Sequence, residues 1–406
     1  MIGPYNCRHQ SELPPCRRST LFTTSTETDP GMRRNTCVFT LLLICGATSV
    51  RMAAQDAGQS APATATAPAD PPAWSAGPIK FSGLVDGYYS LNFNHPASGG
   101  NLYRNFDVMA NQFSINMAKL TLEHDPDPVG FKLDLGFGKA YKVFHSVEPG
   151  GDIMNWVPQA YVSLKPKQMK GTQFDFGKFY TSACAEPMET HLNWNYSRSL
   201  MYALGPYYHM GLRVTQPLTG NFSAGLQVVN GWNNVQDNNS GKTIGLTSAL
   251  TTSKVSWFNN YYAGPEKTGT NEGKRNFFDT VVLLTPSEKA NFYVNFDYGT
   301  ENNIGGGSQD WVVIAAAARF QVTPRVALSP RIEYFDDKDG WATLQPQKLK
   351  EFTFTAEYKM VEGLLARAEY RRDWSDQAVF ERGTGGLHKS QTTMLVGIVA
   401  FFGPAR

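Results

Sequence analysis

Apolar and polar residues alternate along most of the chain from residue 79 onward, and no stripe of helical spacing accompanies them. An alternation of period two produces a β-strand with two unlike faces. In 364–374, for example, Ala366 and Tyr370 fall on one face, whereas Arg367 and Glu369 fall on the other. Roughly sixteen stretches of this kind follow one another, so the sequence predicts an all-β fold.

The segments between the predicted strands alternate in length. Short turns, such as 125–128 and 361–363, are followed by long polar connections, such as 181–205 and 299–310. A transmembrane β-barrel has this plan, with short periplasmic turns, long extracellular loops and an even number of antiparallel strands. A soluble β-sandwich has no reason to keep it. We therefore expect a transmembrane antiparallel up-and-down β-barrel of about 16 strands, within a range of about 14 to 18.

The composition excludes two other classes of protein. The only long apolar run, 38–50, is shorter than the roughly 20 residues that a helix needs to cross a bilayer, so a polytopic helical membrane protein is excluded. Lys and Arg number 37 and Asp and Glu 35, without a basic stretch, so nucleic acid is not an expected partner.

The segment up to residue 54 has the marks of a secretory signal. Met32, Arg33 and Arg34 precede the apolar run, and the small residues Ala53 and Ala54 follow it, in the order of a charged region, an apolar region and a cleavage site. We expect a signal peptide at 32–54, behind an extension (1–31) that precedes the true start. A single N-terminal membrane anchor is the alternative.

The rest of the chain divides into a linker and the barrel. Residues 55–78 are rich in Ala and Pro and cannot bury enough apolar surface to fold, so we expect a linker there and the barrel domain at 79–406. Four of the five cysteines precede residue 55 and only Cys184 follows it. An intrachain disulfide and a cysteine-based metal site are therefore excluded in the mature chain.

Aromatic residues gather near the predicted strand ends, where a membrane barrel carries interfacial girdles. Those that we assign to the girdles are Tyr88, Tyr89, Tyr180, Tyr207, Tyr208, Trp232, Tyr298, Trp311, Tyr334 and Trp374. The apolar last strand ends on Phe402, which resembles the signal that the barrel-assembly machinery reads. Pro330 lies inside a predicted strand without the N–H that a ladder needs, and we expect a bulge there.

Five short motifs occur in order along the predicted barrel. They lie at 83–94, 177–180, 193–199, 208–211 and 229–233 and read GLVDGYYSLNFN, GKFY, NWNYSRS, YHMG and VNGWN. Together they resemble the β-barrel porin-2 (OmpL-like) family, over nearly the whole chain from residue 79. The resemblance implies a porin of the Gram-negative outer membrane through which small hydrophilic solutes diffuse, and it names no solute. The chain departs from the family pattern at 182–184, where Pro or Gly is more usual.

By analogy with sixteen-stranded general porins, the third long loop, about 181–205, would fold into the lumen and form the constriction. The loop residues that we expect in the pore are Glu186, Glu189, His191 and Arg198, and the expected wall residues are Lys132, Asp134, Arg213, Arg331, Glu333, Glu357, Arg367, Glu369 and Arg371. Opposite charges across a narrow passage would sort solutes by charge and dipole. The alternative is that Glu186 and Arg198 are structural and tie the loop to the wall through ion pairs.

Two other functions stay open beside the porin. One is a receptor or adhesin whose long loops are the working surface, and the other is a hydrolase at the barrel rim, each with an occluded lumen. The sequence contains no Gly-x-Ser-x-Gly or His-Glu-x-x-His motif, so we expect no enzyme activity, cofactor or metal. The expected partners are outer-membrane lipid and lipopolysaccharide, the barrel-assembly machinery and small hydrophilic solutes. A homotrimer is left open.

Overall fold

The computed structural model describes residues 75–148, 153–303 and 306–403. The predicted extension, signal peptide and most of the linker therefore lie outside the described residues. Within those ranges, no helix is long and apolar enough to span a bilayer.

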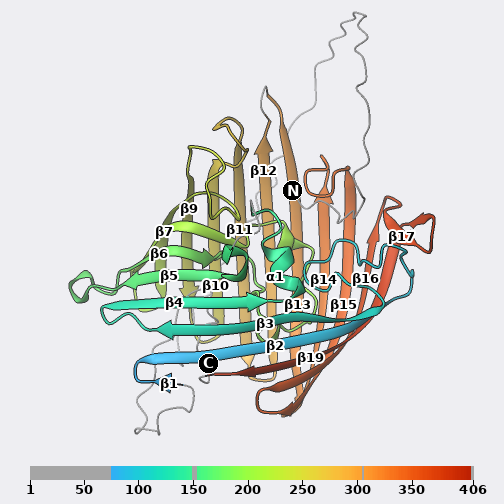
Figure 1. Ribbon diagram of the computed structural model, residues 1–406, viewed down its shortest axis with the longest axis horizontal. Helices are drawn as coiled ribbons and strands as arrows, with labels where there is room; N and C mark the ends of the chain where they lie inside the picture. The colour runs from blue at the N-terminus through green and yellow to red at the C-terminus, as the bar shows by residue number, and fades with distance from the viewer. Residues whose placement is uncertain (1–74, 149–152, 304–305, 404–406) are drawn as a thin grey trace, which may run out of the picture. The chain divides into compact units, whose positions relative to one another are not determined.

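Sixteen antiparallel strands form one closed barrel, as predicted (Figure 1). Strands β2–β7 run nearly horizontally in this view and β10–β16 nearly vertically, because the strands of a barrel tilt and opposite walls therefore cross. The strands are β2 (Ile79–Asn92), β3 (Gln112–His124), β4 (Val129–Phe137), β5 (Gln159–Leu164), β6 (Gln173–Tyr180), β7 (Tyr208–Pro217), β8 (Phe222–Val229), β9 (Thr243–Thr251), β10 (Val255–Pro265), β11 (Lys274–Ser287), β12 (Ala290–Asn302), β13 (Ser308–Thr323), β14 (Val326–Asp337), β15 (Gln347–Val361), β16 (Leu364–Ser375) and β19 (Ser390–Phe402).

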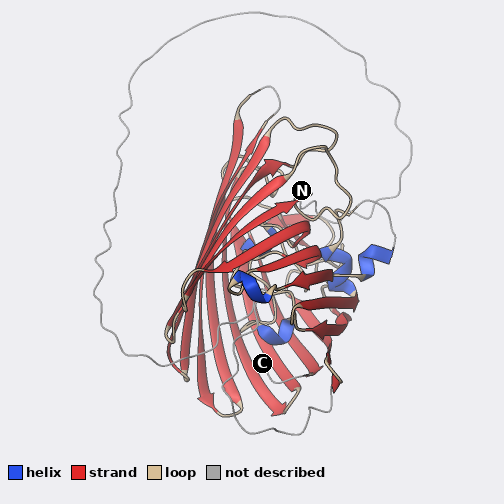
Figure 2. Cartoon of the chain, turned by 90° about the vertical axis from the view of Figure 1, so that its left-hand side faces the viewer, coloured by secondary structure: helices blue, strands red, loops and turns tan. Residues whose placement is uncertain are grey.

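The barrel closes between its first and last strands. β2 pairs with β19 from Asn92 opposite Thr393 to Gly83 opposite Phe402. The sequence neighbours pair in order around the rest of the wall, including β9 with β10. The remaining elements are short: β1 (Ser75–Ala76), α1 (Lys139–Phe144), η1 (Ile153–Trp156), η2 (Lys167–Met169), η3 (Thr190–Leu192), η4 (Met201–Ala203), β17 (Phe380–Arg382) and β18 (Gly386–His388). Figure 2 shows the helices as short blue segments beside the red strands of the wall.

The wall is uneven in height. Strands β4–β9 have 6 to 10 residues, whereas β11–β16 have 12 to 16. The predicted loop 299–310 is wrong in its bounds, because β12 and β13 stay paired up to Asn302 and Ser308. The exposed Tyr298 and Asn302 alternate with the buried Gly299 and Glu301, so the strand pattern continues beyond Gly299.

The two faces of the strands differ as the alternation predicts. Outward-facing apolar side chains are exposed, for instance Val396 at 58% and Ile332 at 58%. Their inward-facing neighbours Arg331 and Leu395 are buried. An apolar outer face and a polar inner face place lipid outside and the polar groups in the lumen.

Two expectations about particular residues are wrong. Four of the predicted girdle residues are buried, with exposures of 3% for Tyr88, 0% for Tyr208, 7% for Trp232 and 1% for Trp311. These aromatic side chains pack within the protein and do not belong to an interfacial girdle. Strand ends also carry inward-folding loops, and aromatic rings are needed there to fill space. Pro330 forms no bulge, because the β14–β15 register runs unbroken through Pro330 opposite Phe354.

Candidate functional site

The segment 181–207 between β6 and β7, which we call the inner loop, packs against the inner face of the barrel. It contains η3 and η4, and residues 195–200 are all buried. Its contacts reach wall strands that are remote in sequence, from β10–β12 to β14–β16 and β2–β3. A loop confined to the barrel rim could not make these contacts.

The beginning of the inner loop is held by the wall at β10–β12. The Ser182 hydroxyl donates to Oδ1 of Asn260 at 2.7 Å. The backbone N–H of Ala185 donates to Oδ1 of Asn295 at 2.7 Å. Residues 182–184, where the chain departs from the family pattern, therefore lie in an ordered segment that polar wall side chains hold.

Glu186 makes a buried ion pair with the wall. Its Oε1 lies 2.6 Å from Nη1 of Arg331 on β14, and its Oε2 accepts the backbone N–H of Ser199 at 2.7 Å. Burial alone would raise the pKa of the Glu186 carboxyl, but the Arg331 guanidinium and the hydrogen bonds of Ser199 hold it below its ordinary value. The carboxylate stays charged and connects the wall with both arms of the loop.

Glu189 contacts another part of the wall, at β3. It forms an ion pair with Lys119 on β3, whose Nζ also lies 2.9 Å from Oδ2 of Asp134 on β4. Burial raises the pKa of the Glu189 carboxyl, whereas the Lys119 ammonium lowers it. The resulting pKa lies below the ordinary value. The predicted loop residue Glu189 and wall residue Asp134 thus share one cation.

Arg367 on β16 binds the backbone of the inner loop. Its guanidinium donates to the carbonyl oxygens of Thr190 at 2.7 Å, Asn193 at 2.5 Å and Asn195 at 3.1 Å. Its other edge donates to Glu357 at 2.6 and 2.8 Å. A buried guanidinium needs partners for its five N–H groups, and this arrangement supplies them from the loop and the wall together.

The other predicted wall charges on β14 and β16 also bind loop backbone. Arg331 donates to the Ser197 carbonyl at 2.7 Å, and Arg371 donates to the Arg198 carbonyl at 2.5 Å. Two carboxylates accept N–H groups of the loop in the same way. Glu369 accepts from Tyr196 at 2.6 Å and Ser197 at 3.1 Å, and Glu333 accepts from Leu200 at 2.6 Å and Met201 at 2.7 Å.

Arg198 and His191 have other environments. The Arg198 guanidinium folds back onto its own loop, where it donates to the carbonyls of Tyr196 at 2.6 Å and Pro187 at 3.2 Å. The His191 ring stacks on Phe401 at 4.6 Å. In these contacts, neither Arg198 nor His191 faces a carboxylate of the wall.

The remaining predicted wall residues pair within the wall. Nη2 of Arg213 on β7 lies 2.8 Å from Oδ2 of Asp175 on β6. Nζ of Lys132 on β4 lies 3.6 Å from Oε2 of Glu123 on β3. The structure therefore brings most of the predicted residues to the inner loop, but places these two cations among wall carboxylates.

The sequence reasoning missed a second loop that packs against the first. In the segment 93–111, Asn105 Nδ2 donates to the Ser199 carbonyl at 2.8 Å, and the Phe106 ring lies 5.5 Å from that of Tyr202. Arg104 is buried and joins Asp107 at 2.6 Å and Asp373 on β16 at 2.9 Å. The available signal in the sequence was the pair Arg104 and Asp107, three residues apart within an Asn-rich loop. A loop that stays in solvent does not need such an ion pair, so the pair indicates a loop that packs against the protein.

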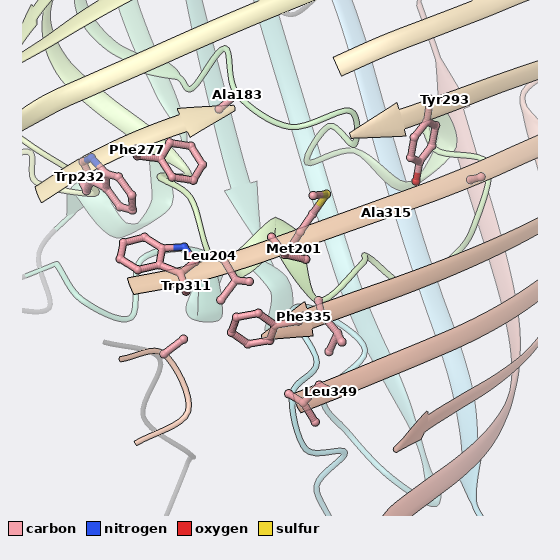
Figure 3. Packing of buried hydrophobic residues seen from close by; sticks show 14 of the residues in the cluster. Ala183, Met201, Leu204, Trp232, Phe277, Tyr293, Trp311, Ala315, Phe335 and Leu349 are labelled. Carbon is pink, nitrogen blue, oxygen red and sulfur yellow. The ribbon is translucent and has the colours of Figure 1, made fainter. Parts of the chain in front are cut away.

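Apolar side chains complete the contact between the inner loop and the wall. Met201 and Leu204 lie in one buried cluster with Trp311 on β13, Phe335 on β14 and Leu349 on β15 (Figure 3). Burying these side chains stabilises the folded position of the loop, since each large apolar group contributes about 1.5 to 3 kcal/mol when fully buried.

In the described part of the chain, no group of three or more His, Cys, Asp or Glu side chains is arranged to hold a metal ion. The buried carboxylates described above are bound to guanidinium, ammonium or N–H groups. The chemistry of the site is that of fixed hydrogen bonds and ion pairs.

The family comparison agrees with this architecture. The family model described as "Putative beta-barrel porin-2, OmpL-like" matches residues 78–402, which is most of the chain. The chain belongs to this family. Its membership identifies an outer-membrane porin and places the protein in the bacterial outer membrane. No curated protein sequence matches the chain.

Solved structures share the fold at low sequence identity. An anion-selective porin from Comamonas acidovorans has a TM-score of 0.56 at 14% identity, covering 80% of this chain and 99% of that one. The trimer form of in-vitro folded OmpT from Vibrio cholerae has a TM-score of 0.55 at 14% identity, with 80% and 99% covered. The outer membrane channel DcaP of Acinetobacter baumannii has a TM-score of 0.54 at 10% identity, with 80% and 97% covered.

Proposed function

We propose that the protein is a passive, non-enzymatic channel for small hydrophilic solutes, with the inner loop as its constriction. The observation that carries the proposal is the hydrogen bonding of loop backbone by inward-facing charges, above all Arg367 on three carbonyls. A constriction must keep its width while solutes pass. Fixed charge-assisted hydrogen bonds supply that rigidity.

The partly exposed side of the inner loop is where we place the solute path. Ala185, Pro187 and Trp194 are only partly buried, in contrast to residues 195–200. The Trp194 ring lies 5.1 Å from that of Tyr293 on β12. These side chains would border the passage, and Glu186 and Glu189 would act by holding the loop in place.

Partner proposals follow from the same fold. We propose a homotrimer, since the similar OmpT structure is described as a trimer form. We also retain outer-membrane lipid and the barrel-assembly machinery as partners, because a barrel with an apolar outer face has to be inserted and kept in lipid.

The test is single-channel recording of the protein, purified from outer membranes, in planar bilayers. Discrete, roughly ohmic conductance steps are the expected result, and their size should fall when uncharged polymers small enough to enter the pore are added. A folded, heat-modifiable barrel that inserts and never conducts would contradict the channel. It would favour a receptor, an adhesin or a rim hydrolase with an occluded lumen.

A further inference from the structure

Four basic side chains gather on the outer surface of the barrel at its extracellular end. Lys348 and Lys350 lie at the start of β15, Arg372 near the end of β16 and Lys389 just before β19, and all four are exposed. On β15 and β16 they alternate with buried, inward-facing neighbours such as Arg371. We call Lys348, Lys350, Arg372 and Lys389 the basic rim.

The strand register brings the basic rim together. Lys350 is opposite Trp374, and Trp374 is opposite Ser390, the residue after Lys389. Neighbouring strands of a sheet lie about 4.8 Å apart, so the cations of the three elements share one patch. Like charges this close repel one another and favour an anion between them.

The charges of the basic rim are largely uncompensated. In the described ranges, no carboxylate forms an ion pair with Lys350 or Lys389, and Arg372 reaches only the Ser390 hydroxyl, at 3.5 Å. Lys348 pairs with Asp336 at 3.5 Å, but its side chain stays 54% exposed. Arg331, Arg367 and Arg371 in the lumen, in contrast, are buried and bound to carboxylates or backbone carbonyls.

A groove lies among these residues. It has a volume of about 380 Å³ and is lined by Arg372, Trp374, Ser375, Lys389 and Ser390. Guanidinium, ammonium and hydroxyl groups are the donors that bind phosphate, with Arg as a two-pronged donor and Lys as a point charge. Tryptophan is favoured at the level of lipid headgroups.

An apolar track continues from the groove toward the middle of the wall. Phe352 on β15 is directly opposite Arg372, and Phe354 and Tyr370 form the next outward-facing pair. On β19, the outward-facing Met394 and Val396 are 52% and 58% exposed. Cationic donors at the membrane surface therefore adjoin a surface suited to acyl chains.

We propose that the basic rim and its groove bind a phosphorylated lipid of the outer leaflet. The phosphate would lie on Arg372, Lys350 and Lys389, and the acyl chains would follow Phe352, Tyr370 and Met394. Free inorganic phosphate would use the donors but not the apolar track. The inference rests on the outer-membrane location and not on conduction, so the two proposals fail independently.

Native mass spectrometry of the detergent-purified protein tests this site. The protein is titrated with a diphosphorylated glucosamine lipid (lipid A), with the same lipid after removal of its phosphates, and with lipid A in the presence of inorganic phosphate. The test variant combines Lys350→Gln, Arg372→Gln and Lys389→Gln. Lys274→Gln is the matched control, since Lys274 is an exposed basic residue at the extracellular start of β11.

The expected result is a lipid A affinity at least about tenfold lower in the triple variant, because charged hydrogen bonds are lost, with Lys274→Gln unchanged. Dephosphorylated lipid should bind wild type as weakly as lipid A binds the variant. Equal binding of both lipids, equal loss in the control, or competition by inorganic phosphate at lipid concentrations would overturn the proposal. If the triple variant does not fold, Lys350→Gln with Lys389→Gln and the lipid comparison on wild type decide the question.

Discussion

The aromatic ring of Tyr196 lies directly against the backbone of Gly397. A Cβ atom at Gly397 would stand 2.4 Å from Cε2 of the ring, closer than atoms approach in proteins. The Tyr196 hydroxyl also donates to Oδ1 of Asp86 on β2 at 2.7 Å. The tip of the inner loop therefore depends on the absence of one side chain in the last strand.

Replacing Gly397 with Ala should displace the loop tip. We expect a cost of about 1 to 3 kcal/mol from overpacking and a change in single-channel conductance, because Tyr196 has to leave the wall. The measurements are conductance and the temperature at which the barrel unfolds on gels. Gly220→Ala is the control, since a Cβ at Gly220 meets nothing within 4 Å. Unchanged conductance in Gly397→Ala would show that the loop tip does not shape the passage.

Arg367→Gln should release the middle of the inner loop. The change removes donors from three carbonyls and leaves Glu357 without that guanidinium in a buried site, and breaking a buried pair costs about 3 to 5 kcal/mol. We expect noisier channels and easier unfolding, with Arg367→Lys in between because it keeps the charge but not the fork. Arg325→Gln, in an exposed turn, should behave like wild type. If Arg367→Gln gives channels with the conductance and low noise of wild type, Arg367 does not hold the inner loop in place.

Acidification should loosen the inner loop. The Glu186 and Glu189 carboxyls have pKa values below the ordinary 4.5, so their ion pairs stabilise the folded loop fully above pH 4.5. This contribution to stability is lost as the pH falls through the lowered pKa values that the two carboxyls have in the folded protein. Recording from about pH 7 to about pH 3 should show the onset of conductance noise only below 4.5. Glu186→Gln should be noisy already at neutral pH, and noise that begins above pH 6 would point to other groups.

Ion selectivity should be weak. The charges of the site occur in pairs, including Arg331 with Glu186 and Lys119 with Glu189, so little net charge faces a solute. We expect the permeabilities for chloride and potassium to differ by less than about tenfold. Reversal potentials in a potassium chloride gradient measure this ratio. A preference for either ion beyond about tenfold would contradict this prediction. It would mean that charged groups outside these ion pairs face the passage.

The fold could be predicted from the sequence because it depends on local patterns. Alternation set the faces of each strand, as in 364–374, and the lengths of the connections indicated a barrel. The contacts of the inner loop could not be predicted in the same way. Arg367 binds carbonyls that lie more than 170 residues away, and a backbone carbonyl has no sequence signature.

The same limit explains the aromatic residues and the loop that were misjudged. Trp311 lies at a strand end, as a girdle residue does, but its ring stacks on Trp341 at 3.7 Å. Whether an aromatic ring at a strand end points into the barrel or toward the lipid depends on the strand register. A register shift of one residue moves the side chain to the other face of the sheet. The loop 93–111 was missed because Arg104 finds Asp373 only after the barrel closes.

The pairing of β2 with β19 also bears on the order of assembly. The binding position of Tyr196 combines Asp86 from the first barrel strand with Gly397 from the last. An open sheet would hold these residues far apart, and contacts between the ends of a chain form slowly because the intervening chain must first be ordered. The complete binding position of the loop tip therefore exists only in a closed barrel.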